Sequence, residues 1–142
     1  MKNRNLTTAS CALCLGLSLL ATPLLAAGTS DWDSNADKTL DRTEFNTRFD
    51  RMGVFKKWDT NADGKLSQTE FKAGMSKHDQ AFNARFGNDA YAKWDGNRDN
   101  WISSTEFNDG LYAAYDKNRN KVIDEPELND VGDDMGDGGL FD

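Results

Sequence analysis

Residues 59–70 place oxygen-bearing side chains at alternate positions of a short segment. Positions 1, 3 and 5 are Asp59, Asn61 and Asp63, a glycine follows at position 6, and Glu70 stands at position 12. Carboxylate and amide oxygens are the donors that a hard divalent cation such as Ca²⁺ prefers, and a loop that holds one must curl until these side chains point inward. Glycine adopts the left-handed backbone that such a turn needs. The residue types and their spacing therefore predict a metal-binding loop.

Three further segments repeat this pattern, and the four are numbered here as loop 1 (33–44), loop 2 (59–70), loop 3 (95–106) and loop 4 (116–127). The side-chain ligands expected from them are Asp33, Asn35, Asp37 and Glu44; Asp59, Asn61, Asp63 and Glu70; Asp95, Asn97, Asp99 and Glu106; and Asp116, Asn118, Asn120 and Glu127. Position 7 is expected to contribute a backbone carbonyl, from Thr39, Lys65, Trp101 and Val122. Four loops in register make a stronger prediction than one.

The loops differ at position 6. Loop 2 has Gly64 there, loop 3 has Asn100, and loops 1 and 4 have Lys38 and Lys121. A left-handed backbone costs a lysine about 1 kcal/mol or more, whereas asparagine adopts it more readily. We therefore expect loop 2 to be the strongest site and loops 1 and 4 to be the weakest.

The flanks of the loops repeat as well. An aromatic residue precedes each loop and an apolar residue follows each terminal glutamate; these are Trp32, Trp58, Trp94 and Tyr115, and Phe45, Phe71, Phe107 and Leu128. With these motifs, residues 32–131 resemble the EF-hand calcium-binding proteins of the calmodulin superfamily. The resemblance implies an all-α fold, an EF-hand helix-loop-helix array with short β contacts between paired loops, and Ca²⁺ as the bound ion.

The spacing of the loops predicts how they pair. Loops 3 and 4 are nine residues apart, enough for one short shared helix, and one helix that Gly53 is expected to kink joins loops 1 and 2. Loops at opposite ends of one helix cannot lie side by side. The 24 residues between loops 2 and 3 suffice for an exit helix, a middle helix over 79–87 and an entering helix from 88 to 94. We expect loop 2 to pair with loop 3 and loop 1 with loop 4, which brings Leu40 near Ile123.

Residues 1–27 have the features of a cleaved export signal. Lys2 and Arg4 form a positive start, an apolar stretch follows, and small residues surround the cleavage expected after Ala27. A membrane anchor is the alternative, but a bilayer needs about 20 apolar residues and Pro23 interrupts this shorter run. We expect a protein exported to the periplasm or secreted, with no membrane attachment after cleavage.

Cleavage would also change the composition. Cys11 and Cys14 are the only cysteines, so residues 28–142 contain none, and the loss of Lys2 and Arg4 takes the formal net charge from −7 to −9. Four bound Ca²⁺ would bring that charge to −1, which indicates that most of the acidity is directed at metal. Because no basic cluster is present, we expect no nucleic-acid partner.

Residues 28–131 are expected to form one four-loop domain, a monomer. The segment 132–142 is rich in glycine and aspartate, and we expect it to be a mobile tail. No enzyme is expected, because His78 is the only histidine and no cysteine follows residue 27. The expected function is that of an exported calcium-binding protein, a buffer or structural binder whose folding Ca²⁺ stabilises. The alternative is a calcium-dependent sensor or docking module that binds a protein partner.

Overall fold

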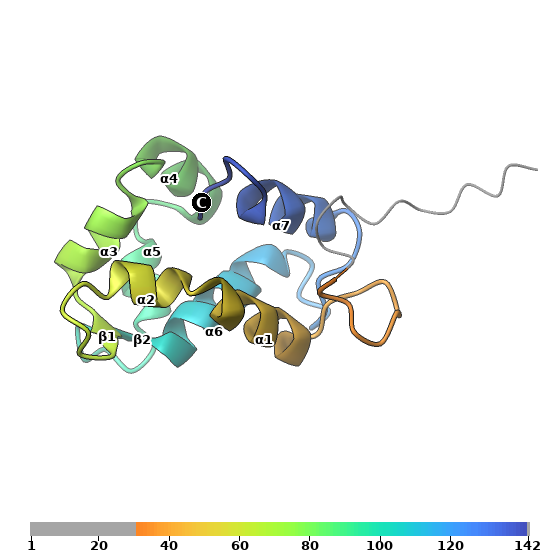
Figure 1. Ribbon diagram of the computed structural model, residues 1–142, viewed down its shortest axis with the longest axis horizontal. Coiled ribbons are helices and arrows are strands. Elements are labelled where there is room, and N and C mark those ends of the chain that lie inside the picture. The colour runs from red at the N-terminus through yellow and green to blue at the C-terminus, as the bar shows by residue number, and fades with distance from the viewer. Residues whose placement is uncertain (1–30, 142) are drawn as a thin grey trace, which may run out of the picture.

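The computed structural model describes residues 31–141, so the expected export signal lies outside the described residues. Within this stretch the chain is mostly helical, with seven helices and one small two-stranded antiparallel sheet (Figure 1). The elements are α1 (Arg42–Met52), α2 (Val54–Trp58), β1 (Lys65–Leu66), α3 (Gln68–Met75), α4 (Asp79–Phe86), α5 (Ala90–Trp94), β2 (Ile102–Ser103), α6 (Ser104–Tyr115) and α7 (Glu127–Met135). None of these helices is long and apolar enough to span a lipid bilayer.

Gly53 separates α1 from α2. Its φ of 69° is left-handed, so the helix expected between loops 1 and 2 breaks there into two segments. The predicted middle helix is α4, which ends at Phe86 with Gly87 as its C-cap, and the predicted shared helix is α6. Helix existence and order therefore follow the sequence prediction, whereas the ends differ by a few residues.

Three helices begin with the same reciprocal cap. The side chain at position 9 of the loop accepts a hydrogen bond from the backbone N–H at position 12, and the glutamate at position 12 accepts one from the N–H at position 9. These pairs are Asp41 with Glu44 at α1, Ser67 with Glu70 at α3, and Ser103 with Glu106 at α6. A cap of this kind stabilises a helix by about 1 kcal/mol. Loops 1, 2 and 3 thus supply the N-terminal caps of the helices that follow them.

Short β contacts join the loops in two pairs. Strands β1 and β2 align Leu66 with Ile102, which joins loop 2 to loop 3. An isolated antiparallel bridge aligns Leu40 with Ile123, and the two residues exchange N–H···O bonds of 2.9 Å each. The predicted pairing of loop 2 with loop 3 and loop 1 with loop 4 is confirmed.

Aromatic rings fill the interior. Phe107, on α6, packs against Phe49, Trp58 and Trp94, with ring centroids 5.2 to 5.8 Å apart. The α6 helix contacts α1, α5 and α7, so it lies at the centre of the molecule (Figure 1). Burial of these rings is the main stabilising contribution to a chain whose described part contains no cysteine.

The end of the chain differs from the mobile tail expected over 132–142. The α7 helix continues to Met135, and Leu140 and Phe141 are buried, with exposed fractions of 9% and 4%. The glycine and aspartate content suggested solvation, but both residues belong to the hydrophobic core, and Phe141 packs against rings of α1, α2 and α4.

Candidate metal centres

Each loop is curled by hydrogen bonds between its own side chains and backbone. In loop 2, Asp59 accepts from the N–H groups of Asp63 and Gly64, at 3.2 and 2.9 Å. Asn61 accepts from Asp63 N–H, and Asp63 in turn accepts from Lys65 N–H, both at 2.9 Å. Side chains 1, 3 and 5 are therefore all turned toward the inside of the loop.

The same bonds occur in the other three loops. Position 1 accepts from the N–H groups of positions 5 and 6, position 3 accepts from position 5, and position 5 accepts from position 7, over distances of 2.8 to 3.2 Å. The position-7 residues Thr39, Lys65, Trp101 and Val122 therefore donate their N–H groups into the loop. Four segments of different sequence thus adopt one internal geometry.

The glutamate at position 12 joins the two ends of each loop. Its Oε1 accepts from the N–H of position 3 and its Oε2 from the N–H of position 9; in loop 2 these distances are 3.2 and 3.0 Å. The corresponding bonds of Glu44, Glu106 and Glu127 are 3.0 to 3.4 Å long. Four of the five glutamates in the chain occupy this position.

In two of the loops these bonds lower the pKa of the glutamate. The N–H of Ser67, with smaller contributions from its hydroxyl and other donors, lowers the pKa of Glu70 to about 2. The N–H of Ser103 likewise lowers the pKa of Glu106. Carboxylates of this kind remain negative well below neutral pH, as a cation site requires.

The loops also share a left-handed backbone at positions 4 and 6. The φ angles at position 4 are 58° to 61°, at Ala36, Ala62, Arg98 and Arg119. Those at position 6 are 66° to 81°, at Lys38, Gly64, Asn100 and Lys121. Sequence reasoning anticipated position 6 and missed position 4, because no glycine or asparagine stands there to signal it. The two turning points reverse the chain around the inward oxygens.

Loop 4 differs in the chemistry of its donors. Asn118 and Asn120 hold positions 3 and 5, and their amide groups donate to Asp124, at position 9, over 3.4 and 2.7 Å. The structure thus brings Asp124 to the same group of side chains, as an additional carboxylate for a loop with two amides. Glu127 is the most buried of the terminal glutamates, with an exposed fraction of 3%.

The donor set can be tested against a metal ion. Within residues 31–141, no three His, Cys, Asp or Glu side chains form a ready-made metal-holding group. Each loop instead combines carboxylates with amide oxygens, so its side-chain donors are all oxygen atoms. Oxygen donors suit the hard ions Ca²⁺ and Mg²⁺ and not a soft or nitrogen-seeking metal. The residues therefore fit a hard cation such as Ca²⁺ or Mg²⁺.

No family model matches the chain. No curated protein matches it either.

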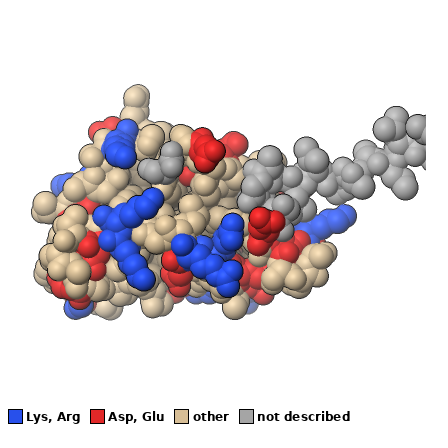
Figure 2. Space-filling model, in the orientation of Figure 1, with Lys and Arg blue, Asp and Glu red and all other residues tan. Residues whose placement is uncertain are grey.

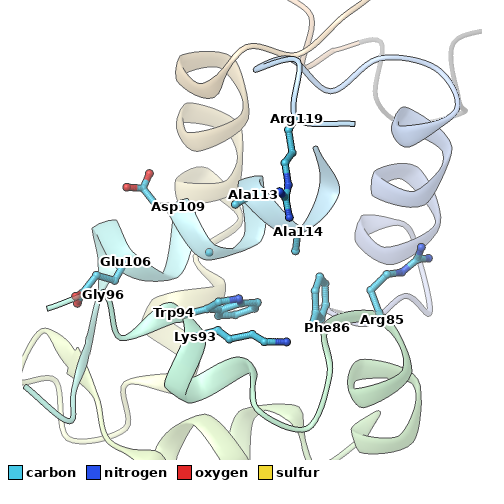
Figure 3. Close-up of a pocket in the computed structure, with 11 residues that line it drawn as sticks. Arg85, Phe86, Lys93, Trp94, Gly96, Glu106, Asp109, Ala113, Ala114 and Arg119 are labelled. Carbon is cyan, nitrogen blue, oxygen red and sulfur yellow. The ribbon is translucent and has the colours of Figure 1, made fainter. Parts of the chain in front are cut away.

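One hollow, with a volume of about 570 Å³, is lined by described residues of α4, α5 and α6 and of loops 3 and 4. Figure 3 shows the side chains of Phe86, Lys93 and Trp94 on one side of it, and Arg119 extending toward Ala114 from the other. Its described lining includes the charged side chains of Lys93, Glu106 and Asp109. On the face shown in Figure 2, positive and negative side chains are interspersed.

Proposed function

We propose that this protein is an exported calcium-binding protein of the EF-hand type, with four sites in loops 1 to 4. The observation that carries the proposal is the fourfold repetition of one loop geometry, in which oxygens at positions 1, 3, 5 and 12 turn inward. The ligands proposed are the side chains at those positions and the carbonyl at position 7. Ca²⁺ would supply the positive charge that these carboxylates lack.

Burial of the carboxylates supports the proposal. Seven polar side chains of the described residues are buried, and five of them hold position 1 or 12 of a loop: Glu44, Glu70, Asp95, Asp116 and Glu127. A buried ionised carboxylate is costly unless an opposite charge or several donors accompany it. Within the described residues, the one ion pair to a carboxylate at these ligand positions is that of Lys65 with Asp99, at 3.9 Å, beyond hydrogen-bond distance. A bound cation would satisfy the remaining lone pairs.

The distribution of apolar surface favours a buffer or structural role over that of a sensor. Trp101, with an exposed fraction of 37%, is the one large hydrophobic residue exposed in the described chain. A sensor with bound Ca²⁺ presents an apolar groove to its target. Here the apolar residues lie in one shared core, so the expected effect of Ca²⁺ is stabilisation. An ion that binds only the folded state at a hundredfold excess over its Kd adds about 2.7 kcal/mol to the free energy of unfolding.

The test is a calcium titration of the chelator-treated protein, followed by calorimetry and by circular dichroism. We expect heat, a gain of helix and a rise in melting temperature as Ca²⁺ reaches millimolar concentration. The absence of both heat and stabilisation would overturn the proposal.

The glutamates offer a matched control. Glu70→Gln should weaken loop 2 selectively, because it removes the charge of the position-12 ligand. Glu125→Gln makes the same chemical change at the one glutamate outside position 12 and should leave binding unchanged.

A further inference from the structure

Tyr91 joins loop 3 to the loop with which it pairs. It lies on α5, four residues before position 1 of loop 3. Its hydroxyl donates to the carbonyl of Asn100 at 2.6 Å and to the carbonyl of Leu66 at 3.2 Å. Asn100 holds position 6 of loop 3, and Leu66 holds position 8 of loop 2. A phenol carries one hydrogen, so the two carbonyls share it, and the shorter bond is the one to loop 3.

Tyr112 makes the same two contacts in the other loop pair. It lies on α6, four residues before position 1 of loop 4, and it is buried. Its hydroxyl donates to the carbonyl of Lys121 at 2.8 Å and to that of Leu40 at 3.3 Å. These acceptors are again position 6 of the tyrosine's own loop and position 8 of the paired loop. The N–H of Ile123 also donates to the carbonyl of Leu40, at 2.9 Å, so two donors from α6 and loop 4 meet on one carbonyl of loop 1.

The rings of both tyrosines are held by equivalent neighbours. Tyr91 packs edge-on against Phe71, with ring centroids 5.4 Å apart, and Tyr112 packs edge-on against Phe45 at 5.7 Å. Phe71 and Phe45 follow the terminal glutamates of loops 2 and 1. The guanidinium of Arg42 lies 5.3 Å from the centre of the Tyr112 ring. Because these contacts involve the ring alone, a phenylalanine can keep them while it loses the hydroxyl.

The two hydroxyls act on loops that lack glycine at position 6. Asn100 and Lys121 have φ angles of 66° and 73°, in the left-handed region that costs free energy for a residue with a Cβ atom. Loop 2 has Gly64 at position 6, and the residue four places before this loop is Phe55, which has no hydroxyl. The corresponding residue of loop 1 lies outside the described residues. A phenol is thus present in both cases where a strained position 6 can be compared with the described helix before it.

The bonded carbonyl belongs to the peptide group that joins positions 6 and 7. In loop 3 the N–H of this group, on Trp101, donates to Asp99 at 2.9 Å, while its carbonyl accepts from the phenol. In loop 4 the N–H of Val122 donates to Asn120 at 3.0 Å, and the carbonyl again accepts from the phenol. The peptide group is therefore held at both ends. It leads directly into position 7, whose own carbonyl is a proposed calcium ligand.

We propose that Tyr91 and Tyr112 are positioning residues of the calcium sites in loops 3 and 4. Each hydroxyl holds the left-handed turn at position 6, where glycine is missing, and its longer bond ties that turn to the paired loop. This inference rests on the function proposed above. It implies that loop 4 binds calcium more tightly than its lysine at position 6 alone would allow.

The test compares Tyr91→Phe and Tyr112→Phe with the unaltered full-length chain in a calcium titration followed by NMR. The position-7 amides report on the four sites separately; these are Thr39, Lys65, Trp101 and Val122. The net contribution of one hydrogen bond corresponds to a change of about fivefold in a binding constant. We expect Tyr91→Phe to weaken loop 3 about fivefold, with a smaller loss in loop 2 and none in loops 1 and 4. Tyr112→Phe should weaken loop 4 in the same way, with a smaller loss in loop 1 and none in loops 2 and 3.

A glycine at position 6 separates this role from a general effect on stability. Lys121→Gly removes the strain that the hydroxyl offsets, so adding Tyr112→Phe to it should weaken loop 4 by less than about twofold. General destabilisation would weaken all four loops, and Lys121→Gly would not rescue it. An unchanged loop 4 in Tyr112→Phe, an equal loss in all four loops, or the lack of this rescue overturns the proposal.

A second measurement reads stability and does not require calcium to bind. Urea denaturation in millimolar calcium compares the drop in midpoint that Tyr112→Phe causes with and without Lys121→Gly. We expect a smaller drop when Lys121→Gly is present, and an equal drop overturns the proposal. The titration of the unaltered protein keeps the two proposals apart. Lack of binding there overturns the proposed function and the calcium role of both tyrosines, whereas binding that neither Tyr→Phe change alters overturns this inference alone.

Discussion

The indole ring of Trp94 lies directly against Gly110. A Cβ atom on Gly110 would stand 2.3 Å from Cγ of Trp94, far inside van der Waals contact. Trp94 ends the helix that leads into loop 3, and Gly110 lies on the helix that leaves it. The same relationship recurs around loop 2, where a Cβ on Gly74 would stand 2.1 Å from the ring of Trp58. The helices flanking both central loops are thus packed as closely as the backbone allows.

Gly110→Ala should destabilise the protein. Alanine favours a helix by about 1 kcal/mol over glycine, but here its methyl group displaces the indole ring, and overpacking of this kind costs about 1 to 3 kcal/mol. We expect a net loss in the free energy of unfolding, measured by urea denaturation in calcium. Gly96→Ala is the control, because the nearest atom to its added Cβ is 3.9 Å away. An alanine at 110 that stabilises the chain would contradict the close packing.

Acid titration of the metal-free protein should show the effect of the cap on Glu70. The folded-state pKa of about 2 is below the ordinary value of 4.5, so the folded chain binds this proton less tightly than the unfolded chain. The contribution of Glu70 to stability is therefore present above about pH 4.5 and is lost as the pH falls toward 2. Ser67→Ala removes one of the donors and should raise this pKa, as measured by NMR of the carboxyl carbon. Ser104→Ala, outside the capping box, should leave it unchanged.

Truncation at the loop bridges should separate the two pairs of sites. Ile123 and Ile102 hold equivalent positions, are both fully buried, and face Leu40 and Leu66 respectively. Loss of the side chain at either position should cost about 2 to 5 kcal/mol. We expect Ile123→Ala to weaken calcium binding in loops 1 and 4, and Ile102→Ala to weaken it in loops 2 and 3. Amide shifts of Lys121 and Gly64 during calcium titration report on the two pairs. Identical effects of the two variants would show that the bridges do not divide the sites.

Arg85→Gln should destabilise the contact between α4 and α7. Asp134 is buried with an exposed fraction of 5%, and its desolvation raises its pKa despite Arg85. Removal of one partner of a buried pair costs about 3 to 5 kcal/mol. Because protonation relieves the uncompensated charge, the loss should be larger at about pH 7 than at about pH 5. Urea denaturation at both values is the measurement, with the exposed Arg51→Gln as control. A loss that does not depend on pH would show that Asp134 does not carry it.

The loop pairing could be predicted from the sequence because it depends on distance along the chain. Nine residues allow one helix and 24 allow several, and that difference alone separates Leu40 from Leu66 and places it beside Ile123. The break in the helix at Gly53 could be predicted as well, because a glycine within a helical pattern indicates a break. Both features depend on spacing along the chain or on the type of one residue, so they can be recognised in the sequence.

Two other features, the backbone at position 4 and the burial of Phe141, could not be recognised from residue types. The left-handed backbone at position 4 falls on alanine and arginine, so only the geometry of the folded loop reveals it. The burial of Phe141 depends on rings more than fifty residues away in sequence, such as Trp58 and Phe82. Composition described residues 132–142 correctly as rich in glycine and aspartate, but two apolar side chains decided where the segment lies.

The two ends of the molecule are connected by one rigid arm and one jointed arm. The rigid arm is α6, an unbroken helix of 12 residues that emerges from loop 3 and leads into loop 4. The jointed arm is α1 with α2, which runs from loop 1 to loop 2 and is broken at Gly53. The α6 helix therefore makes a continuous connection between the two loop pairs, while the left-handed backbone of Gly53 changes the direction of the other connection. Stiffening that joint would force both loop pairs to move as one body.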